Sequence, residues 1–206
     1  MTPEEILAES FRRIEEAVGP HPFTGEEWPI VRRMIHASGD LEIIKHISFT
    51  AGAAAAGIDA LRAGRPLVTD VQMVATGIAR PLLDALEIPL HCYIDDPEVT
   101  QQARATGQTR SLLAMQKAIR IAGDAIYAIG NAPTALLALC AAIRAGQVQP
   151  RLILALPVGF VSVIESKEEA LALDVPVLAL RGRKGGSGMT AAAINAMLLL
   201  ARDQER

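Results

Sequence analysis

The chain opens with two stretches in which apolar residues recur at helical spacing, with charged residues between them. Thr2 stands three residues before Glu5, and Thr24 stands three residues before Glu27. This is the spacing of a capping box, in which each side chain accepts a hydrogen bond from the backbone N–H of the other residue at the start of a helix. The second stretch ends at Gly39, a residue that favours helix termination. The sequence therefore predicts two helices before any strand.

After Gly39 the pattern changes to short apolar runs that alternate with helical ones. Strands that are apolar throughout, rather than at every second residue, are buried on both faces, as in parallel sheets covered by helices. No linker, repeat or low-complexity segment divides residues 1–206, so we expect one α/β domain with five or six mainly parallel strands. The predicted strands are 47–49, 66–70, 91–94, 125–129, 152–156 and 176–180. The predicted helices after Gly39 are 51–63, 71–80, a short one through 86, 97–121, 133–145, 167–172 and 190–202.

Composition limits the classes of function. The formal charge of −3 gives no general attraction to nucleic acid, and an aromatic content of 3% argues against a base-stacking surface. No apolar run reaches the roughly 20 residues of a membrane span, and the N-terminus lacks a signal-peptide pattern. Cys92 and Cys140 stand in apolar contexts, as expected of free thiols in a reducing compartment. We expect a soluble cytoplasmic protein that binds neither nucleic acid nor membrane.

Polar and glycine-rich segments follow several predicted strands. Asp70 and Met73 follow the second strand, Asn131 follows the fourth, and the segment 181–188 follows the sixth. In open α/β sheets, ligands bind beyond the carboxyl ends of the strands. We therefore expect the ligand-binding residues to gather at this edge of the sheet.

The segment 181–188, Arg-Gly-Arg-Lys-Gly-Gly-Ser-Gly, has more than one interpretation. A relaxed dinucleotide fingerprint is present from Gly186 onward, but it comes after the last strand instead of the first. Lys184 precedes the glycines, which excludes a Walker loop. The remaining alternatives are an anion site, formed by basic residues and the N–H groups of a helix start, and a solvated loop. The segment around Asn131 resembles it, and two such sites would suit a ligand with several carboxylates.

One of the four histidines stands in a distinctive setting. His36 is predicted in the last turn of a helix, where the helix dipole favours the imidazolium form, between Arg33 and Asp40. An imidazolium near neutrality suits general acid catalysis, although an exposed histidine without a catalytic role fits the same pattern. No second histidine or cysteine stands at metal-ligand spacing, and no nucleophile motif is present. We expect neither a metal nor a cofactor.

Seven segments in order resemble the precorrin-8X methylmutase family of cobalamin biosynthesis, and together they extend over nearly the whole chain. Each segment is weak alone, but their order is specific. The segments are Glu9–Phe11, Arg33–Asp40, Val68–Val74 with Gly77–Ile78, Thr109–Ser111, Gly130–Thr134, Pro157–Val161 with Glu165–Lys167, and Arg181–Ser187.

The resemblance implies a three-layer, flavodoxin-like α/β fold and a homodimer with a partly shared active site. It also implies an isomerase that moves a methyl group from C11 to C12 on ring C of (cobalt-)precorrin-8, giving hydrogenobyrinate or cobyrinate. By the same resemblance, His36 matches the catalytic histidine, and Ser10 and Arg110 match substrate-binding positions. From the matched loops we also expect substrate contacts from Asp70, Met73, Asn131, Lys184 and Ser187.

A sigmatropic methyl shift needs no nucleophile, metal or redox cofactor. This agrees with a sequence in which we find no nucleophile motif and no metal-ligand spacing. Protonation of the conjugated ring system makes the rearranging carbons electron-poor, so one positioned acid is sufficient. Two rival functions are a noncatalytic corrinoid carrier, which would not need His36, and a nicotinamide or flavin oxidoreductase.

Overall fold

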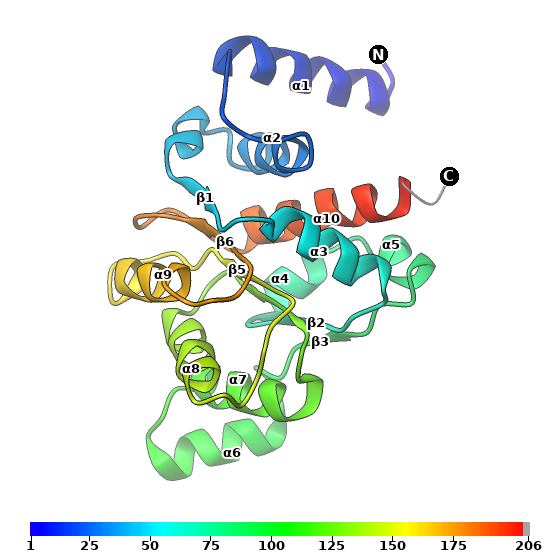
Figure 1. Ribbon diagram of the computed structural model, residues 1–206. Coiled ribbons are helices and arrows are strands. Elements are labelled where there is room, and N and C mark those ends of the chain that lie inside the picture. Colours follow the sequence, from blue (N-terminus) through cyan, green and yellow to red (C-terminus); the bar gives the residue numbers. More distant parts are fainter. Residues whose placement is uncertain (204–206) are drawn as a thin grey trace.

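The computed structural model describes residues 1–203 and has an α/β architecture (Figure 1). Its six-stranded sheet has the order β1-β6-β5-β4-β2-β3 within the described residues. All neighbouring strands are parallel except β1, which runs antiparallel to β6. The mainly parallel sheet predicted from the apolar runs is therefore confirmed. The strands are β1 (Ile47–Phe49), β2 (Leu67–Thr69), β3 (Leu90–His91), β4 (Ile126–Ile129), β5 (Leu152–Ala155) and β6 (Val177–Leu180).

Helices cover both faces of this sheet. They are α1 (Pro3–Val18), α2 (Glu27–Ser38), α3 (Ala53–Arg62), α4 (Gln72–Gly77), α5 (Arg80–Ala85), α6 (Pro97–Thr106), α7 (Arg110–Ala122), α8 (Pro133–Arg144), α9 (Val163–Leu171) and α10 (Ser187–Asp203). A short 3₁₀ helix, η1 (Leu41–Lys45), connects α2 to β1 and was not predicted.

Successive residues of each central strand point into different hydrophobic cores. In β4, Ile126 and Ala128 pack with residues of α2, α3, α4, α5 and α10, whereas Tyr127 and Ile129 pack with residues of α7, α8 and α9. Both groups of side chains are fully buried. This two-sided burial is the physical reason why the strands are apolar throughout.

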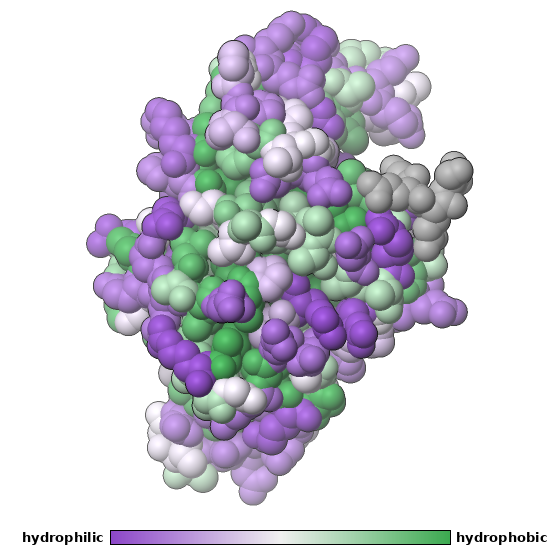
Figure 2. Space-filling view, in the orientation of Figure 1, coloured by the Kyte–Doolittle hydropathy of each residue, from purple (hydrophilic) through white to green (hydrophobic). Residues whose placement is uncertain are grey.

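The two predicted N-terminal helices are present and lie outside the three layers. Figure 1 shows α1 above α2, and α2 above α10, which lies on the sheet. Both capping boxes form: Thr2 exchanges hydrogen bonds with Glu5, and Thr24 with Glu27. No residue of α1 is buried, so this helix packs on α2 and η1 through one face only. On the face shown in Figure 2, polar side chains cover most of this end of the molecule.

The prediction of one long helix from 97 to 121 was wrong. The chain forms α6 and α7 instead, with a break at Gly107, which has a φ of +72° and ends α6. Thr109 then caps α7 by accepting a hydrogen bond from the N–H of Leu112. Both signals, a glycine with left-handed backbone and a threonine cap, were present in the sequence, but the continuous helical spacing outweighed them.

Several other boundaries also differ from prediction. The strand predicted at 91–94 is confined to Leu90–His91, because a turn follows it. Helix α9 begins at Val163 instead of 167, and α10 begins at Ser187 instead of 190. The last difference matters most for the site, because Ser187 and Gly188 belong to the first turn of a helix.

Two further findings concern the chain as a whole. None of the described helices is long and apolar enough to cross a membrane. Cys92 and Cys140 are both free thiols, and burial raises the pKa of each.

Candidate functional site

The loops after β2, β4, β5 and β6 lie together at the carboxyl edge of the sheet. From the loop after β2 the chain enters α4, which packs on one face, whereas from the loop after β4 it enters α8, which packs on the other. Such a divergence between neighbouring parallel strands opens a crevice where α/β proteins bind ligands. A second divergence lies between β5, followed by α9, and β6, followed by α10.

Asp70 connects the loop after β2 to the loop after β4 by hydrogen bonds to main-chain N–H groups. It is buried, and its carboxylate accepts hydrogen bonds from the N–H groups of Gly130 (2.9 Å), Asn131 (2.9 Å) and Ala132 (2.7 Å). Burial raises the pKa of Asp70, and the three donors oppose that rise because they favour the carboxylate. The N–H groups expected to receive a ligand's carboxylate are therefore bonded to Asp70, and the side chain of Asn131 makes no cap.

The basic loop after β6 is paired with acidic residues on two sides. Arg181 forms an ion pair with Glu168 of α9, and Lys184 forms one with Asp40. The hydrogen bond between Lys184 and Asp40 raises the pKa of the lysine and lowers that of the carboxyl group. The guanidinium of Arg183 lies 5.8 Å from the ring centroid of Phe160, and among residues 1–203 it has no ion-pair partner. Arg183 is thus the cation of this loop best placed to meet a substrate anion.

This loop is pressed against its neighbours. A Cβ at Gly185 would lie 2.3 Å from the carbonyl oxygen of Leu156 and 2.4 Å from that of Pro157. The N–H of Gly186 donates to the same oxygen of Leu156 at 2.9 Å. Only glycine allows such an approach of two backbones.

The loop after β4 reaches the start of α10. A Cβ at Gly130 would lie 3.1 Å from the Cα of Ser187 and 2.8 Å from Oγ1 of Thr190. Ser187 itself is buried. The structure therefore brings two of the predicted anion-binding segments, those around Asn131 and Ser187, into direct contact.

His36 is exposed in the last turn of α2, as the sequence predicted. Its ring meets the ring of Phe11 edge to face, with centroids 5.6 Å apart. The guanidinium groups of Arg32 and Arg33 lie 4.2 and 5.1 Å from the centroid of the same phenylalanine. Burial and the neighbouring Arg32 lower the pKa of Arg33. Phe11 therefore connects α1 to the helix end that carries the histidine.

Asp40 joins this helix end to the loops of the sheet. It follows Gly39, which ends α2 in the left-handed conformation, and its carboxylate caps η1 at Glu42. The same carboxylate binds Lys184. Through this ion pair, the end of α2 that carries His36 is attached to the basic loop after β6.

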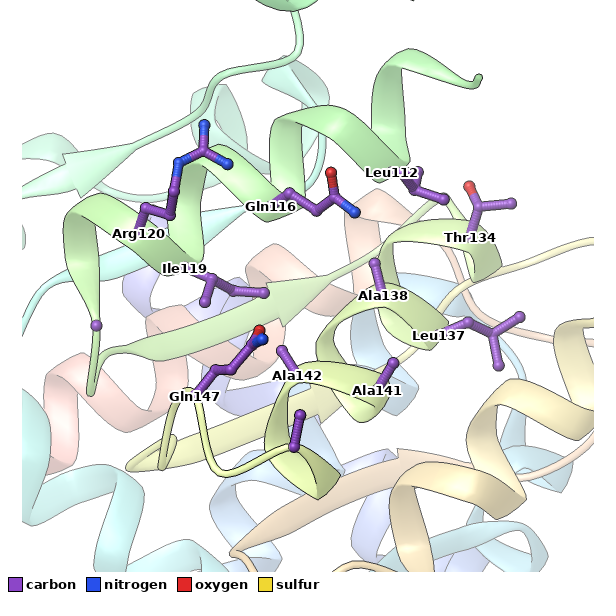
Figure 3. A pocket seen from close by; sticks show the side chains of 12 residues that line it. Leu112, Gln116, Ile119, Arg120, Thr134, Leu137, Ala138, Ala141, Ala142 and Gln147 are labelled. Carbon is purple, nitrogen blue, oxygen red and sulfur yellow. The ribbon is translucent and has the colours of Figure 1, made fainter. Parts of the chain in front are cut away.

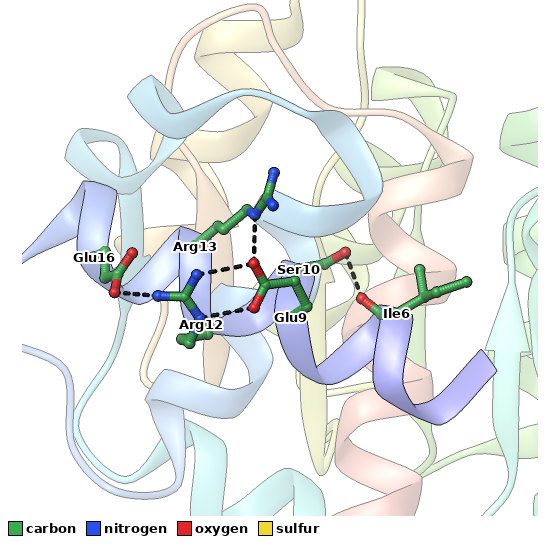
Figure 4. Close-up of polar contacts among 6 residues, drawn as sticks. All are labelled: Ile6, Glu9, Ser10, Arg12, Arg13 and Glu16. Carbon is green, nitrogen blue, oxygen red and sulfur yellow. Dashed lines mark hydrogen bonds and ion pairs between the residues drawn. The ribbon is translucent and has the colours of Figure 1, made fainter. Parts of the chain in front are cut away.

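Ser10 lies on α1, beside Phe11 in the sequence. Figure 4 shows its hydroxyl directed back along the helix, where it donates to the carbonyl oxygen of Ile6 at 2.9 Å. The adjacent Glu9 is held by Arg12 and Arg13, which lower the pKa of its carboxyl group to about 2. The hydroxyl of Ser10 keeps its acceptor lone pairs, and it can rotate toward a ligand.

Arg110 lies next to Thr109, which contacts the start of α8, the helix that follows the Asn131 loop. Arg110 is the first residue of α7, exposed, and 3.5 Å from Asp95. Thr109 contacts Thr134 of α8 through their hydroxyl groups at 3.4 Å, which brings the starts of α7 and α8 together. The break before α7 thus places Arg110 at a helix start instead of the interior position predicted from sequence.

Exposed large apolar side chains stand on the loop after β5 and at the start of α4. Met73 is 72% exposed, Phe160 87% and Val161 81%. Apolar groups at the rim of a polar crevice provide contacts for the flat, apolar faces of a ligand.

A large surface groove lies elsewhere, between α7 and α8, and has a volume of about 1070 Å³. Figure 3 shows Leu112, Gln116 and Arg120 of α7 opposite Leu137 and Ala138 of α8. Apart from Thr134 at its end, none of its lining residues belongs to the loops described above. Its size alone does not make it the reaction site.

The described residues contain no group of three acidic, histidine or cysteine side chains that could hold a metal ion. Sequence reasoning placed Lys167 at a predicted helix start and in a matched family segment, but it gave this lysine no role. It is fully buried, and its ammonium donates to the carbonyl oxygens of Gly182 (2.9 Å) and Lys184 (2.7 Å). Its position in a helix with buried Val163 and Ala170 was a signal that the lysine points inward.

Comparisons with known proteins agree with this arrangement. The cobalt-precorrin-8 methylmutase of Priestia megaterium is 47% identical over 97% of this chain and 88% of its own length. The precorrin-8X methylmutase of Pseudomonas aeruginosa is 39% identical over 94% of each chain. The solved precorrin-8X methylmutase from Thermus thermophilus has a TM-score of 0.90 and 40% identity, covering 97% of this chain and 98% of that one.

The family model described as precorrin-8X methylmutase matches residues 5–200. The match includes all seven sequence segments and every loop of the crevice. The chain therefore belongs to the precorrin-8X methylmutase family, whose members are isomerases.

Proposed function

We propose that the protein moves a methyl group from C11 to C12 of ring C in precorrin-8 or its cobalt form, giving hydrogenobyrinate or cobyrinate. His36 is the general acid of this reaction. The observation that carries the proposal is the exposed imidazole of His36 at a helix end joined to the crevice by the Asp40–Lys184 pair. The family membership supports the reaction class.

The physical role of His36 is to donate a proton or a strong hydrogen bond to the conjugated ring system. The imidazole lies in the last turn of α2 and packs edge to face with the ring of Phe11. Protonation draws electron density from ring C, so the methyl group migrates to the adjacent carbon without leaving the substrate. One well-placed acid is worth about 10²- to 10⁴-fold in rate.

His36→Ala should lower kcat by about 10²- to 10⁴-fold and change the affinity for hydrogenobyrinate by less than about threefold. His46→Ala is the matched control, because His46 is another exposed histidine at the end of a helical segment. Visible absorption measures both turnover and binding. A His36 variant that turns over at the rate of the wild type would contradict the assignment.

The remaining predicted residues hold the macrocycle. Arg110, Lys184 and the hydroxyls of Ser10 and Ser187 bind the peripheral carboxylates, and the side-chain amide of Asn131 adds a further donor. Met73 contacts an apolar face of the ring. Asp70 acts on the substrate through the loop 130–132 that it holds. Together these groups position the migrating methyl relative to His36.

Arg110→Ala should weaken the binding of hydrogenobyrinate by about tenfold, because a charge-assisted hydrogen bond is lost. Arg120→Ala removes an exposed arginine from the other end of the same helix and serves as the control. Affinity is measured by absorption titration. Equal affinities of the two variants would return Arg110 to a solvent-exposed role.

We also propose a homodimer with a partly shared active site, which the family resemblance implies. Sedimentation equilibrium should give about twice the 21.9 kDa of one chain. The mass of a single chain at micromolar concentration would contradict it.

A further inference from the structure

A buried lysine outside the residues assigned above makes an unusual contact with the basic loop. Lys167 of α9 is 0% exposed, and no carboxylate within the described residues accepts a hydrogen bond from its ammonium. Instead, the ammonium binds two carbonyl oxygens of one loop, those of Gly182 and Lys184. Buried charges are costly unless they are fully bonded, so a lysine that serves only to fill space would be replaced by an apolar residue at lower cost.

The two acceptors stand in a loop without regular secondary structure. The backbone of this loop takes left-handed or glycine-only conformations at Gly182 (φ 81°) and Gly186 (φ 122°). Its amides are bonded at only a few places, such as Gly186 to Leu156. Without Lys167, the carbonyl groups of residues 182 and 184 would have to find water, and the loop would gain conformational freedom.

Lys184 is held at both ends as a result. Its carbonyl oxygen accepts from Lys167, and its ammonium binds Asp40, which follows the helix end that carries His36. A continuous set of contacts therefore runs from α9 through the loop to α2. These contacts attach the end of α2 to the basic loop after β6.

We propose that Lys167 is a positioning residue of the isomerase: its ammonium holds the main chain of the basic loop, so that Lys184 and Arg183 meet the substrate's carboxylates while His36 meets ring C. This inference rests on the proposed function, and it adds a residue that does not touch the substrate. Burial lowers the pKa of Lys167 to about 8, in keeping with an ammonium that has only neutral partners.

Lys167→Met tests the proposal, because methionine has a similar length and no donors. Hydrogen exchange followed by mass spectrometry should show faster exchange of peptides covering residues 182–187, with unchanged exchange in β4 and β5. KM for the precorrin substrate should rise about tenfold, with a smaller change in kcat. Ser166→Ala is the matched control, since Ser166 is buried beside Lys167 but donates only to Val163 of its own helix.

Lys167→Arg keeps both the charge and the donors, and it should restore protection of the loop at least in part. Loop exchange in Lys167→Met equal to that of the wild type overturns the proposal, and so does an arginine variant as unprotected as the methionine variant. Hydrogen exchange is compared between the unliganded proteins, so its outcome does not depend on the identity of the substrate. Absence of turnover by the wild type would therefore overturn the proposed function alone.

Discussion

At the scale of single residues, the charged groups around the crevice differ in how far the fold itself neutralises them. Arg181 and Lys184 have carboxylate partners, and Asp70 is bonded to three main-chain N–H groups. Arg183 and His36 keep their polar atoms toward solvent. In the proposed reaction, Arg183 and His36 meet the substrate without giving up a partner, whereas Lys184 binds the substrate while it stays paired with Asp40.

The titration of Lys167 should be visible in the stability of the protein. Its pKa is about 8 in the folded chain and returns to its usual 10.5 on unfolding. Between these values the unfolded state binds more protons, so the contribution of Lys167 to the free energy of unfolding rises with pH and is lost as pH falls toward 8. Urea unfolding at about pH 7 and about pH 10 should show the wild type gaining stability relative to Lys167→Met. A constant difference between the two proteins would contradict the shift.

Which residues the sequence could predict depends on how local their environment is. The place of His36 in the last turn of a helix depends on neighbours within a few residues, and it was predicted correctly. The partners of Asp70 are 60 to 62 residues away, and those of Lys167 are 15 and 17 residues away across a strand. No spacing rule predicts such contacts, because they exist only after the sheet has formed.

At the scale of elements, the site is made by loops that pack on one another. The loop after β4 lies against both α4 and the start of α10, and the loop after β6 lies against the end of β5. Each contact is close enough to require glycine. The geometry of the crevice therefore depends on the absence of side chains at Gly130 and Gly185.

Gly130→Ala should destabilise the protein by about 1–3 kcal/mol, because the new Cβ would lie 2.6 Å from Cγ2 of Val74 and 2.8 Å from Oγ1 of Thr190. Gly188→Ala is the control. Its Cβ would meet nothing within 4 Å, and alanine favours the first turn of α10. Thermal unfolding should show a lower Tm for the first variant only. Equal Tm values would mean that the loops separate easily.

The elements themselves were predicted well where periodicity and caps agreed, as in α1 and α2. They were predicted poorly where the two conflicted. The apolar spacing of residues 97–121 continues through Gly107, but the backbone turns there, and α7 packs against α8 as a separate helix. The break decides the position of Arg110, so an error in an element boundary became an error in the site.

At the scale of the whole molecule, the hydrophobic cores lie on the two faces of the sheet, and the polar loops of the candidate site lie at its carboxyl edge. Two cores hold the sheet from both sides, and the loops at its carboxyl edge carry the polar groups. The α1–α2 pair lies beyond one layer, and the Asp40–Lys184 ion pair attaches the end of α2 to this edge. The alternation of predicted strands and helices was enough to predict that polar loops gather at the carboxyl edge of the sheet. The attachment of the α1–α2 pair to this edge could be seen only in the structure.

In the proposed isomerisation, the methyl group moves without leaving the substrate. The most direct measurement is ¹³C NMR of the purified protein incubated with precorrin-8 labelled at the C11 methyl group. We expect the label to move to C12 with full retention, and we expect the visible spectrum to change to that of hydrogenobyrinate. Bound corrin whose label stays on C11 would show a carrier in place of an isomerase and would contradict the proposed reaction.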